Sequence, residues 1–140
     1  MAETIHVDIV SAEGEIFAGE AKMVFLPAAE GEIGVAPRHA PLLTLLKAGE
    51  VRVVPAEGEE QSFYVGGGAL EVQPRKVTVL ADTAARATDL DEAAAEAARQ
   101  RAEEALAGKV DKIEQAEALA ELARAAAQLK LIQRLRKTKG

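Results

Sequence analysis

The sequence predicts an α+β chain in two domains: an N-terminal antiparallel β-sandwich or barrel, then a C-terminal antiparallel two-helix hairpin. Over residues 1–86, short apolar segments alternate with turn residues at the ~8–12-residue spacing typical of such sheets. All five prolines and nine of the eleven glycines lie before residue 75. Strong helix formers dominate after Arg86. We therefore expect domains at residues 1–86 and 87–140.

The first domain contains several predicted strands. In TIHVDIV, Ile5, Val7 and Ile9 alternate with polar residues, which predicts a half-buried strand with His6 facing outward. Turn residues follow at 12–14 and around Gly19. The other segments that read as strands are KMVFLP, EVRVVP, QSFYV, ALEVQP and KVTVLAD.

A run of three glycines, residues 66–68, follows QSFYV. No Gly-Lys-Ser/Thr follows it, so it does not match a phosphate-binding loop. Glycines inside a strand pattern more often mark a bend or a point where another backbone approaches closely. We expect that structural role here.

Two helices are predicted after Arg86. Asp89 with Glu92, and Asp111 with Glu114, resemble capping boxes at the two helix starts, and Gly108 ends the first helix. The short connection predicts antiparallel helices. The expected inward stripes are Ala94, Ala98, Ala102 and Ala105 on the first helix, and Leu119, Leu122, Ala126 and Leu129 on the second. Alanines bury little apolar surface, so this pattern fits a hairpin that opens, and equally a static one.

Composition narrows the functional classes. The formal net charge of −6 argues against nonspecific nucleic-acid binding. No apolar run approaches the ~20 residues of a membrane span, and the N-terminus lacks signal-peptide features. The absence of cysteine excludes disulfides and thiolate chemistry. These features predict a cytosolic globular protein.

Candidate catalytic residues are few. The two serines, Ser11 and Ser62, lie outside any Gly-x-Ser-x-Gly motif. His39 lies between Pro37 and Pro41, which leaves three interpretations: a catalytic histidine, a metal ligand, or a stiff docking loop. No second histidine or cysteine lies nearby to support a metal site. The prolines restrict the backbone, and a polar tip formed by Glu30, Gly31 and Glu32 lies just upstream, so we expect both loops to lie side by side as a docking surface.

A basic tail closes the second helix. It contains Lys130, Arg134, Arg136 and Lys137. Such a tail is most often a solvated helix end or a contact for an acidic partner, and less often a membrane or nucleic-acid patch.

Three long segments closely resemble the epsilon-chain family of bacterial F-type ATP synthases. They are EGEIGVAPRHAPLLTLLKAGEVRV, GGGALEVQPRKVTVLADTA and DLDEAAAEAARQRAEEAL, and the resemblance extends over nearly the whole chain. It implies a ten-stranded β-sandwich, a helical hairpin, and a non-catalytic role in the rotor's central stalk, on the cytoplasmic face of the bacterial plasma membrane without membrane insertion.

The resemblance also implies partners. The family binds the gamma subunit and the ring of c subunits, and its hairpin can extend into the alpha/beta catalytic head and hinder ATP hydrolysis. By this resemblance, Glu30, Gly31, Glu32, Arg38 and His39 match the c-ring interface and Ser11 the gamma-facing surface. The basic tail would be the inhibitory end of the extended hairpin.

Some family members bind ATP in the folded hairpin, and here the matching motif is incomplete. Leu90, Asp91, Ala95 and Arg124 match the motif, but Ala94 and Gln128 replace two basic residues. The resemblance therefore implies weak ATP binding at most. The rival interpretations are a free-standing nucleotide sensor and a soluble enzyme.

Overall fold

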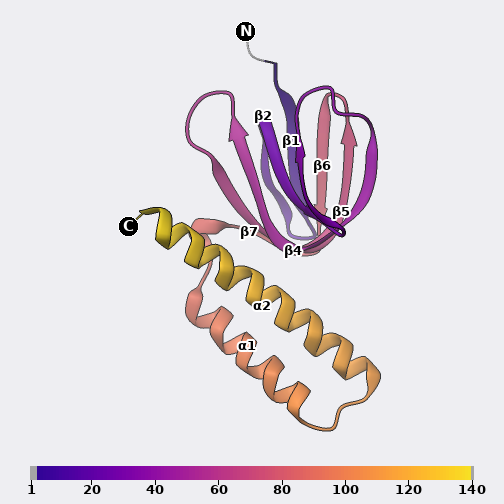
Figure 1. Ribbon diagram of the computed structural model, residues 1–140, viewed down its shortest axis with the longest axis vertical. Coiled ribbons are helices and arrows are strands. Elements are labelled where there is room, and N and C mark those ends of the chain that lie inside the picture. The colour runs from indigo at the N-terminus through magenta and orange to yellow at the C-terminus, as the bar shows by residue number, and fades with distance from the viewer. Residues whose placement is uncertain (1–2, 140) are drawn as a thin grey trace. The chain divides into compact units, whose positions relative to one another are not determined.

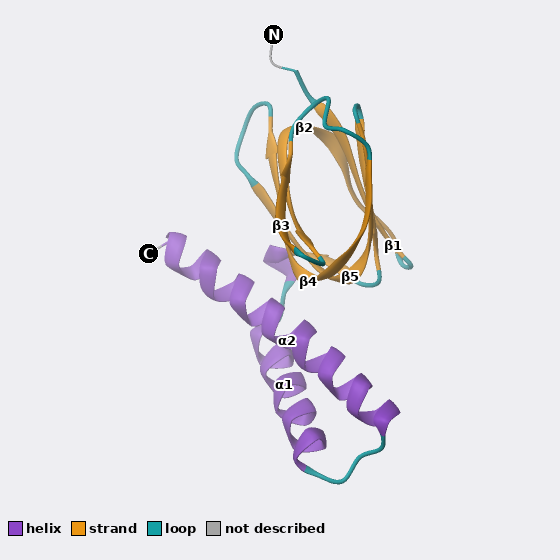
Figure 2. Cartoon of the chain, turned by 45° about the vertical axis from the view of Figure 1, so that its right-hand side comes forward, coloured by secondary structure: helices purple, strands orange, loops and turns teal. Residues whose placement is uncertain are grey.

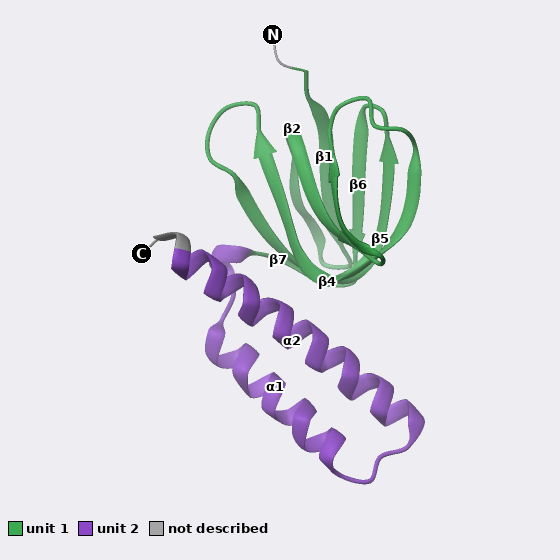
Figure 3. Ribbon diagram, in the orientation of Figure 1, with its two compact units in different colours: residues 1–86 green, residues 87–140 purple. Residues whose placement is uncertain are grey.

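The computed structural model describes residues 3–139. The chain divides into two compact units, residues 1–86 and 87–140, which Figure 3 shows in different colours. The first is built of strands and the second of helices, as the sequence predicts.

The β unit contains seven strands within the described residues (Figure 1). They are β1 (Ile5–Ser11), β2 (Gly14–Ala28), β3 (Gly31–Val35), β4 (Leu42–Pro55), β5 (Gln61–Gln73), β6 (Lys76–Ala81) and β7 (Ala84–Arg86).

Hydrogen bonding closes these strands into a flattened barrel with two layers (Figure 2). The strand order is β1-β6-β5-β4-β2-β3, and β7 pairs with β5. β1 also pairs with β2, which closes the first five strands of this path into a ring. All pairings are antiparallel except that between β1 and β6, which is parallel. That parallel pair is the one departure from the predicted antiparallel sheet.

The strand count differs from the ten that the resemblance implied because three strands are long and serve both layers. β2, β4 and β5 have 15, 14 and 13 residues. The first half of β2 pairs with β1, and its second half pairs with β3 and β4. Counting each long strand twice turns seven strands into ten, so the architecture is the predicted sandwich.

The glycine run produces one of the bends. Gly67 and Gly68 have φ angles of 106° and 139°, which side chains rarely adopt. A Cβ atom on Gly68 would lie 2.1 Å from the Leu80 carbonyl oxygen. The prediction of a bend with close backbone approach is therefore confirmed.

The core lies between the two layers. Ile5, Val7 and Ile9 are fully buried, as their alternation predicts, and they pack with apolar residues from the other strands. The largest side chain in this core is Phe63, whose ring centroid lies 5.2 Å from that of Phe17. Burial of this apolar surface is the main stabilising contribution to the sandwich.

Three segments differ from the sequence-based expectations. Gly19 lies inside β2 rather than in a turn, where its lack of a side chain leaves room for the Phe17 ring. β4 begins at Leu42, well before the predicted strand. Gly31–Val35, expected to be loop, pairs with β2 as β3. Local turn residues do not reveal these non-local pairings.

The helical unit consists of a 3-10 turn (Ala87–Asp89), α1 (Glu92–Ala107) and α2 (Lys112–Lys139). Asp111 caps α2 as predicted, with its Oδ1 accepting a hydrogen bond from Glu114 N at 2.8 Å. The cap of α1 is Asp91 rather than Asp89, because the 3-10 turn takes up Asp89. Gly108 ends α1 as predicted.

The seam between the helices is mostly alanine, and it contains Ala102 as predicted, while its other buried alanines lie one position away from the predicted stripe. Within residues 92–137, the buried residues of the two helices are Ala95, Ala102, Ala118, Ala125 and, as the one larger side chain, Leu131. Of the predicted positions, Ala94 and Ala105 are exposed and Leu119 is 51% exposed. Each buried methyl contributes about 0.8 kcal/mol at most. The two helices therefore adhere weakly.

Candidate interaction surfaces

The turn between β2 and β3 presents carboxylates to solvent. We call Glu30, Gly31 and Glu32 the acidic turn. Gly31 has a φ of 140°, which suits glycine and sets the direction of the chain into β3. A shallow cavity of about 220 Å³ lies beside this turn. Its walls are Ala28, Glu30, Gly31, Glu32, Ile33, Leu42 and Thr44.

The side chain of Glu32 contacts an arginine of β4. Its carboxylate lies 3.6 Å from the Arg52 guanidinium, which also pairs with Glu60 at 3.2 Å. The guanidinium carbon of Arg52 lies 4.3 Å from the centroid of the Phe25 ring. This cation–π contact and two carboxylates fix Arg52 on the outer face of the sheet.

The loop of residues 36–41, the proline loop, follows β3. Arg38 adopts a positive φ of 68°, and its backbone N–H donates to the Pro74 carbonyl at 2.8 Å. Its side chain pairs with Glu3 at 2.8 Å. The Nδ1 atom of His39 lies 2.6 Å from the Ala40 carbonyl oxygen. These contacts hold the proline loop beside the β5–β6 turn.

The acidic turn and the proline loop lie at opposite ends of β3, so the expectation that they lie side by side is wrong. Gly31, at one end of β3, pairs with Ala28, and Ala28 pairs with Leu46. Beyond the other end of β3, the proline loop contacts Pro74. The strand between the two loops spans about 13 Å, at roughly 3.3 Å per residue. The predicted c-ring residues therefore form two groups, Glu30–Glu32 and Arg38–His39.

Ser11 lies near the end of the sandwich that carries the acidic turn, one position beyond the residue of β1 that pairs with an exposed leucine. It pairs with Ala81, and Val10 pairs with Leu80. In adjacent strands Leu80 pairs with Ala69, and Ala69 with Leu45.

We call Leu43, Leu45 and Leu80 the outer leucine row. Their exposed fractions are 76%, 67% and 55%. Sequence reasoning missed these residues, although the run LLTLL carries the signal. In a strand with one buried face, a continuous apolar run must also place leucines on the other face.

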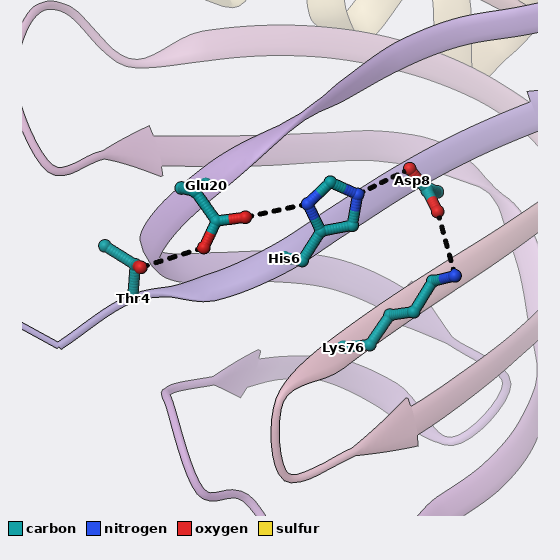
Figure 4. Close-up of polar contacts among 5 residues, drawn as sticks. All are labelled: Thr4, His6, Asp8, Glu20 and Lys76. Carbon is teal, nitrogen blue, oxygen red and sulfur yellow. Dashed lines mark hydrogen bonds and ion pairs between the residues drawn. The ribbon is translucent and has the colours of Figure 1, made fainter.

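A polar cluster surrounds His6 on the outer face of β1 and its neighbours (Figure 4). His6 Nδ1 lies 2.7 Å from a Glu20 carboxylate oxygen, and Nε2 lies 2.9 Å from Asp8. Glu20 also accepts from the Thr4 hydroxyl, and Asp8 pairs with Lys76 at 3.2 Å. The cluster ties β1 to β2 and β6.

These contacts shift the ionisation of the cluster. Hydrogen bonding to Glu20, and then to Asp8, raises the pKa of His6. The hydrogen bond from His6 lowers the pKa of Glu20. Partial burial opposes ionisation of Asp8, but His6 and Lys76 together bring its pKa below the ordinary value. Protonated His6 is therefore favoured between two carboxylates.

In the helical unit, most residues of the expected nucleotide motif have other roles or surroundings. The Asp91 carboxylate already accepts from Ala94 N at 3.1 Å as the cap of α1. Ala95 is only 2% exposed, because it lies in the seam. Arg124 and Leu90 are half-buried.

The basic tail lies along the last turns of α2. Lys130, Arg136 and Lys137 are exposed, and Arg134 is half-buried. Arg136 forms an ion pair with Glu92 at the start of α1. A second ion pair between the helices joins Arg101 to Glu121 at 3.3 Å.

Among residues 3–139, no three histidine or carboxylate side chains come together in a way that could hold a metal ion. Neither α1 nor α2 has the length and apolar character needed to cross a bilayer.

Two family models together match almost the whole chain. The model of the ATP synthase delta/epsilon chain β-sandwich domain matches residues 4–87. The model of the ATP synthase delta/epsilon chain long α-helix domain matches residues 88–133.

Two individual ATP synthase epsilon chains are similar to this chain over nearly its whole length. An ATP synthase epsilon chain of Nitrosococcus oceani is 64% identical over 140 residues, covering 100% of both chains. One from Alkalilimnicola ehrlichii is 63% identical over 134 residues, covering 96% of each.

A solved structure shares the fold. It is a chain in the Euglena gracilis mitochondrial ATP synthase, with a TM-score of 0.70 and 17% identity, covering 98% of this chain and 82% of that one. A chain in the Tetrahymena thermophila central stalk and c ring has a TM-score of 0.66 and 12% identity, covering 93% and 97%. With both family models and full-length relatives in agreement, this chain belongs to the family of ATP synthase epsilon chains.

Proposed function

We propose that this chain is a non-catalytic rotor subunit in the central stalk of a proton-translocating F-type ATP synthase. It would couple rotation of the c ring to the catalytic head, from the cytoplasmic face of the bacterial plasma membrane. Membership of the epsilon-chain family supports this role. So does the shared fold with chains from central-stalk and c-ring assemblies.

The outer leucine row carries the proposal. Leu45 and Leu80 flank Ala69 across three hydrogen-bonded strands, and Val10 of β1 pairs with Leu80, one position before Ser11. Clustered exposed leucines are costly on a free surface and typical of a protein interface. We assign this face, with Ser11, to the gamma subunit.

We assign the acidic turn to the c ring. Glu30 lies in the turn and Glu32 is the second residue of β3. Arg52 restrains Glu32, so less side-chain entropy would be lost on docking. Arg38 and His39 fall outside this assignment because β3 separates them from the turn.

The hairpin would act as a brake on ATP hydrolysis. Its alanine seam adheres weakly, so α1 and α2 can separate without loss of a large apolar core. When extended, Lys130, Arg134, Arg136 and Lys137 would meet acidic surfaces of the alpha/beta head. A nucleotide sensor finds less support, since Asp91 and Ala95 already serve the cap and the seam.

The test is binding to purified gamma subunit. We expect Leu45→Asp and Leu80→Asp each to weaken binding at least tenfold, because a carboxylate would be buried in an apolar contact. Leu119→Asp is the matched control, since Leu119 is an exposed leucine on α2, 51% accessible. Equal affinity for all three variants and the unmodified chain would refute the assignment of this face.

A further inference from the structure

One arginine of the basic tail is bound within the hairpin itself. Arg136 lies near the C-terminal end of α2, and its guanidinium pairs with the carboxylate of Glu92, the first residue of α1. The two residues are 44 positions apart in sequence, so only the closed hairpin brings them together. Both side chains are accessible, 66% and 47% exposed.

Only some of the ion pairs in this unit depend on closure. Arg101 and Glu121 join α1 to α2, as Arg136 and Glu92 do. Arg99, by contrast, pairs with Glu96 and Glu103 on its own helix. Separation of the helices would break the ion pairs between α1 and α2 and leave the pairs within α1 intact.

Because the alanine seam is weak, ion pairs between the helices contribute an appreciable part of the stability of the closed hairpin. The buried side chains of the seam are mostly methyl groups, which contribute little adhesion. An exposed ion pair is also weak, but it is comparable with one buried methyl. The closed state is therefore sensitive to the pair between Glu92 and Arg136.

We propose that Glu92 is an internal docking site for Arg136, so that the closed hairpin masks a tail charge and opening requires its release. The proposal rests on the braking role proposed above, because it makes Glu92 a competitor of the acidic partner surface for the same arginine. Removing Glu92 should favour the extended state. Removing Arg136 should also favour opening, but it leaves the extended tail one charge short.

The opening equilibrium of the isolated full-length chain can be measured with a buried thiol. The chain has no cysteine, and Ala102 is 1% exposed in the seam. The rate at which a thiol reagent modifies Ala102→Cys is therefore proportional to the open population. Ala105→Cys, which is exposed on the same helix, calibrates intrinsic reactivity.

At low salt, Glu92→Gln and Arg136→Gln should each raise the modification rate about two- to fivefold, the range for one exposed ion pair. The double variant should not exceed the faster single variant, since both remove the same contact. Lys137→Gln and Glu103→Gln are the matched controls. They remove one charge from the same tail and the same helix without breaking a contact between helices. Added salt should reduce the difference between variants and controls.

Two results would overturn the proposal: equal rates for Arg136→Gln and Lys137→Gln, or fully additive effects in the double variant. Hydrolysis by the assembled enzyme tests the braking role separately. There Glu92→Gln should lower hydrolysis relative to Glu103→Gln. A raised thiol rate with unchanged hydrolysis would support the internal contact and refute the brake.

Discussion

His6 and Glu20 are paired across β1 and β2, and the Nδ1 atom of His6 lies 2.7 Å from a carboxylate oxygen of Glu20. Asp8 contacts the opposite ring nitrogen at 2.9 Å, so the imidazole bridges two carboxylates (Figure 4). The contact makes the stability of the β unit depend on pH.

The first prediction concerns this dependence. Because Glu20 and Asp8 raise the pKa of His6 in the folded state, its contribution is complete below the ordinary value of 6.5. It is lost as pH rises through the raised folded value. At acid pH the two carboxylates have the corresponding effect. Because the fold lowers the pKa values of Glu20 and Asp8, their contribution to stability is lost as pH falls below about 4.5. Stability should therefore fall as pH rises above about 6.5, and His6→Gln should flatten this slope.

Urea unfolding followed by tyrosine fluorescence measures how the free energy of unfolding depends on pH. Tyr64 in β5 is a suitable probe because it is the single tyrosine and tryptophan is absent. The effect should stay within about 1 kcal/mol, since the cluster is partly exposed. His39→Gln, a change outside the cluster, should keep the slope. An unchanged slope in His6→Gln would show that the bridge does not contribute.

The second prediction concerns the bend in β5. Gly68→Ala should destabilise the sandwich by about 3 kcal/mol or more, because the new Cβ would lie 2.1 Å from a backbone oxygen at a φ of 139°. Gly58→Ala should cost only about 1–2 kcal/mol. It too has a positive φ, 97°, but nothing lies within 4 Å of its Cβ. Urea unfolding with Tyr64 fluorescence compares them, and similar losses would mean that the close approach is unimportant.

The third prediction separates the two ends of the sandwich. A cysteine at position 32 should cross-link to a cysteine in the polar loop of the c ring, whereas one at position 39 should not, because β3 lies between them. Glu32→Lys should weaken proton pumping driven by ATP in membranes. Cross-linking from both positions with equal yield would contradict the assignment.

The fourth prediction concerns nucleotide. The isolated chain should bind ATP in the millimolar range at best. Ala94 and Gln128 lack the charge-assisted contacts, each roughly 1.5–3 kcal/mol, that basic residues would supply. Ala94→Arg with Gln128→Arg should strengthen binding. Titration calorimetry measures both, and micromolar binding by the unmodified chain would contradict the expectation.

The fifth prediction concerns the hairpin as a whole. In assembled enzyme, removal of residues 87–140 should raise ATP hydrolysis and leave synthesis nearly unchanged, because the surfaces that we propose for gamma and the c ring consist of residues of the β unit, 1–86. Neutralising Arg134, Arg136 and Lys137 should reproduce part of the effect. The comparison requires equal incorporation of both forms, and equal hydrolysis rates would then leave the hairpin without a braking role.

The sequence by itself determined the fold class of each half and several local features. Strand alternation at Ile5, Val7 and Ile9, the cap at Asp111 and the end of α1 at Gly108 all depend on neighbours close in sequence. Backbone preferences and side-chain period act over that short range, so the residues themselves reveal them. The glycine run belongs to the same class, because positive φ angles favour glycine wherever the chain bends.

Only the tertiary structure decided how distant segments meet. The pairing of β3 with β2 separates Glu32 from His39, although both lie within one short stretch of sequence. The seam contains Ala102 as predicted, but it buries Ala95 rather than Ala94 and leaves Ala105 exposed. In an alanine-rich helix all faces have a similar apolar character, so only contact with the partner helix determines which face is buried. The contacts of Glu20 with His6, and of Glu92 with Arg136, likewise require strand register and helix pairing. These are set by non-local packing, which local propensity does not encode.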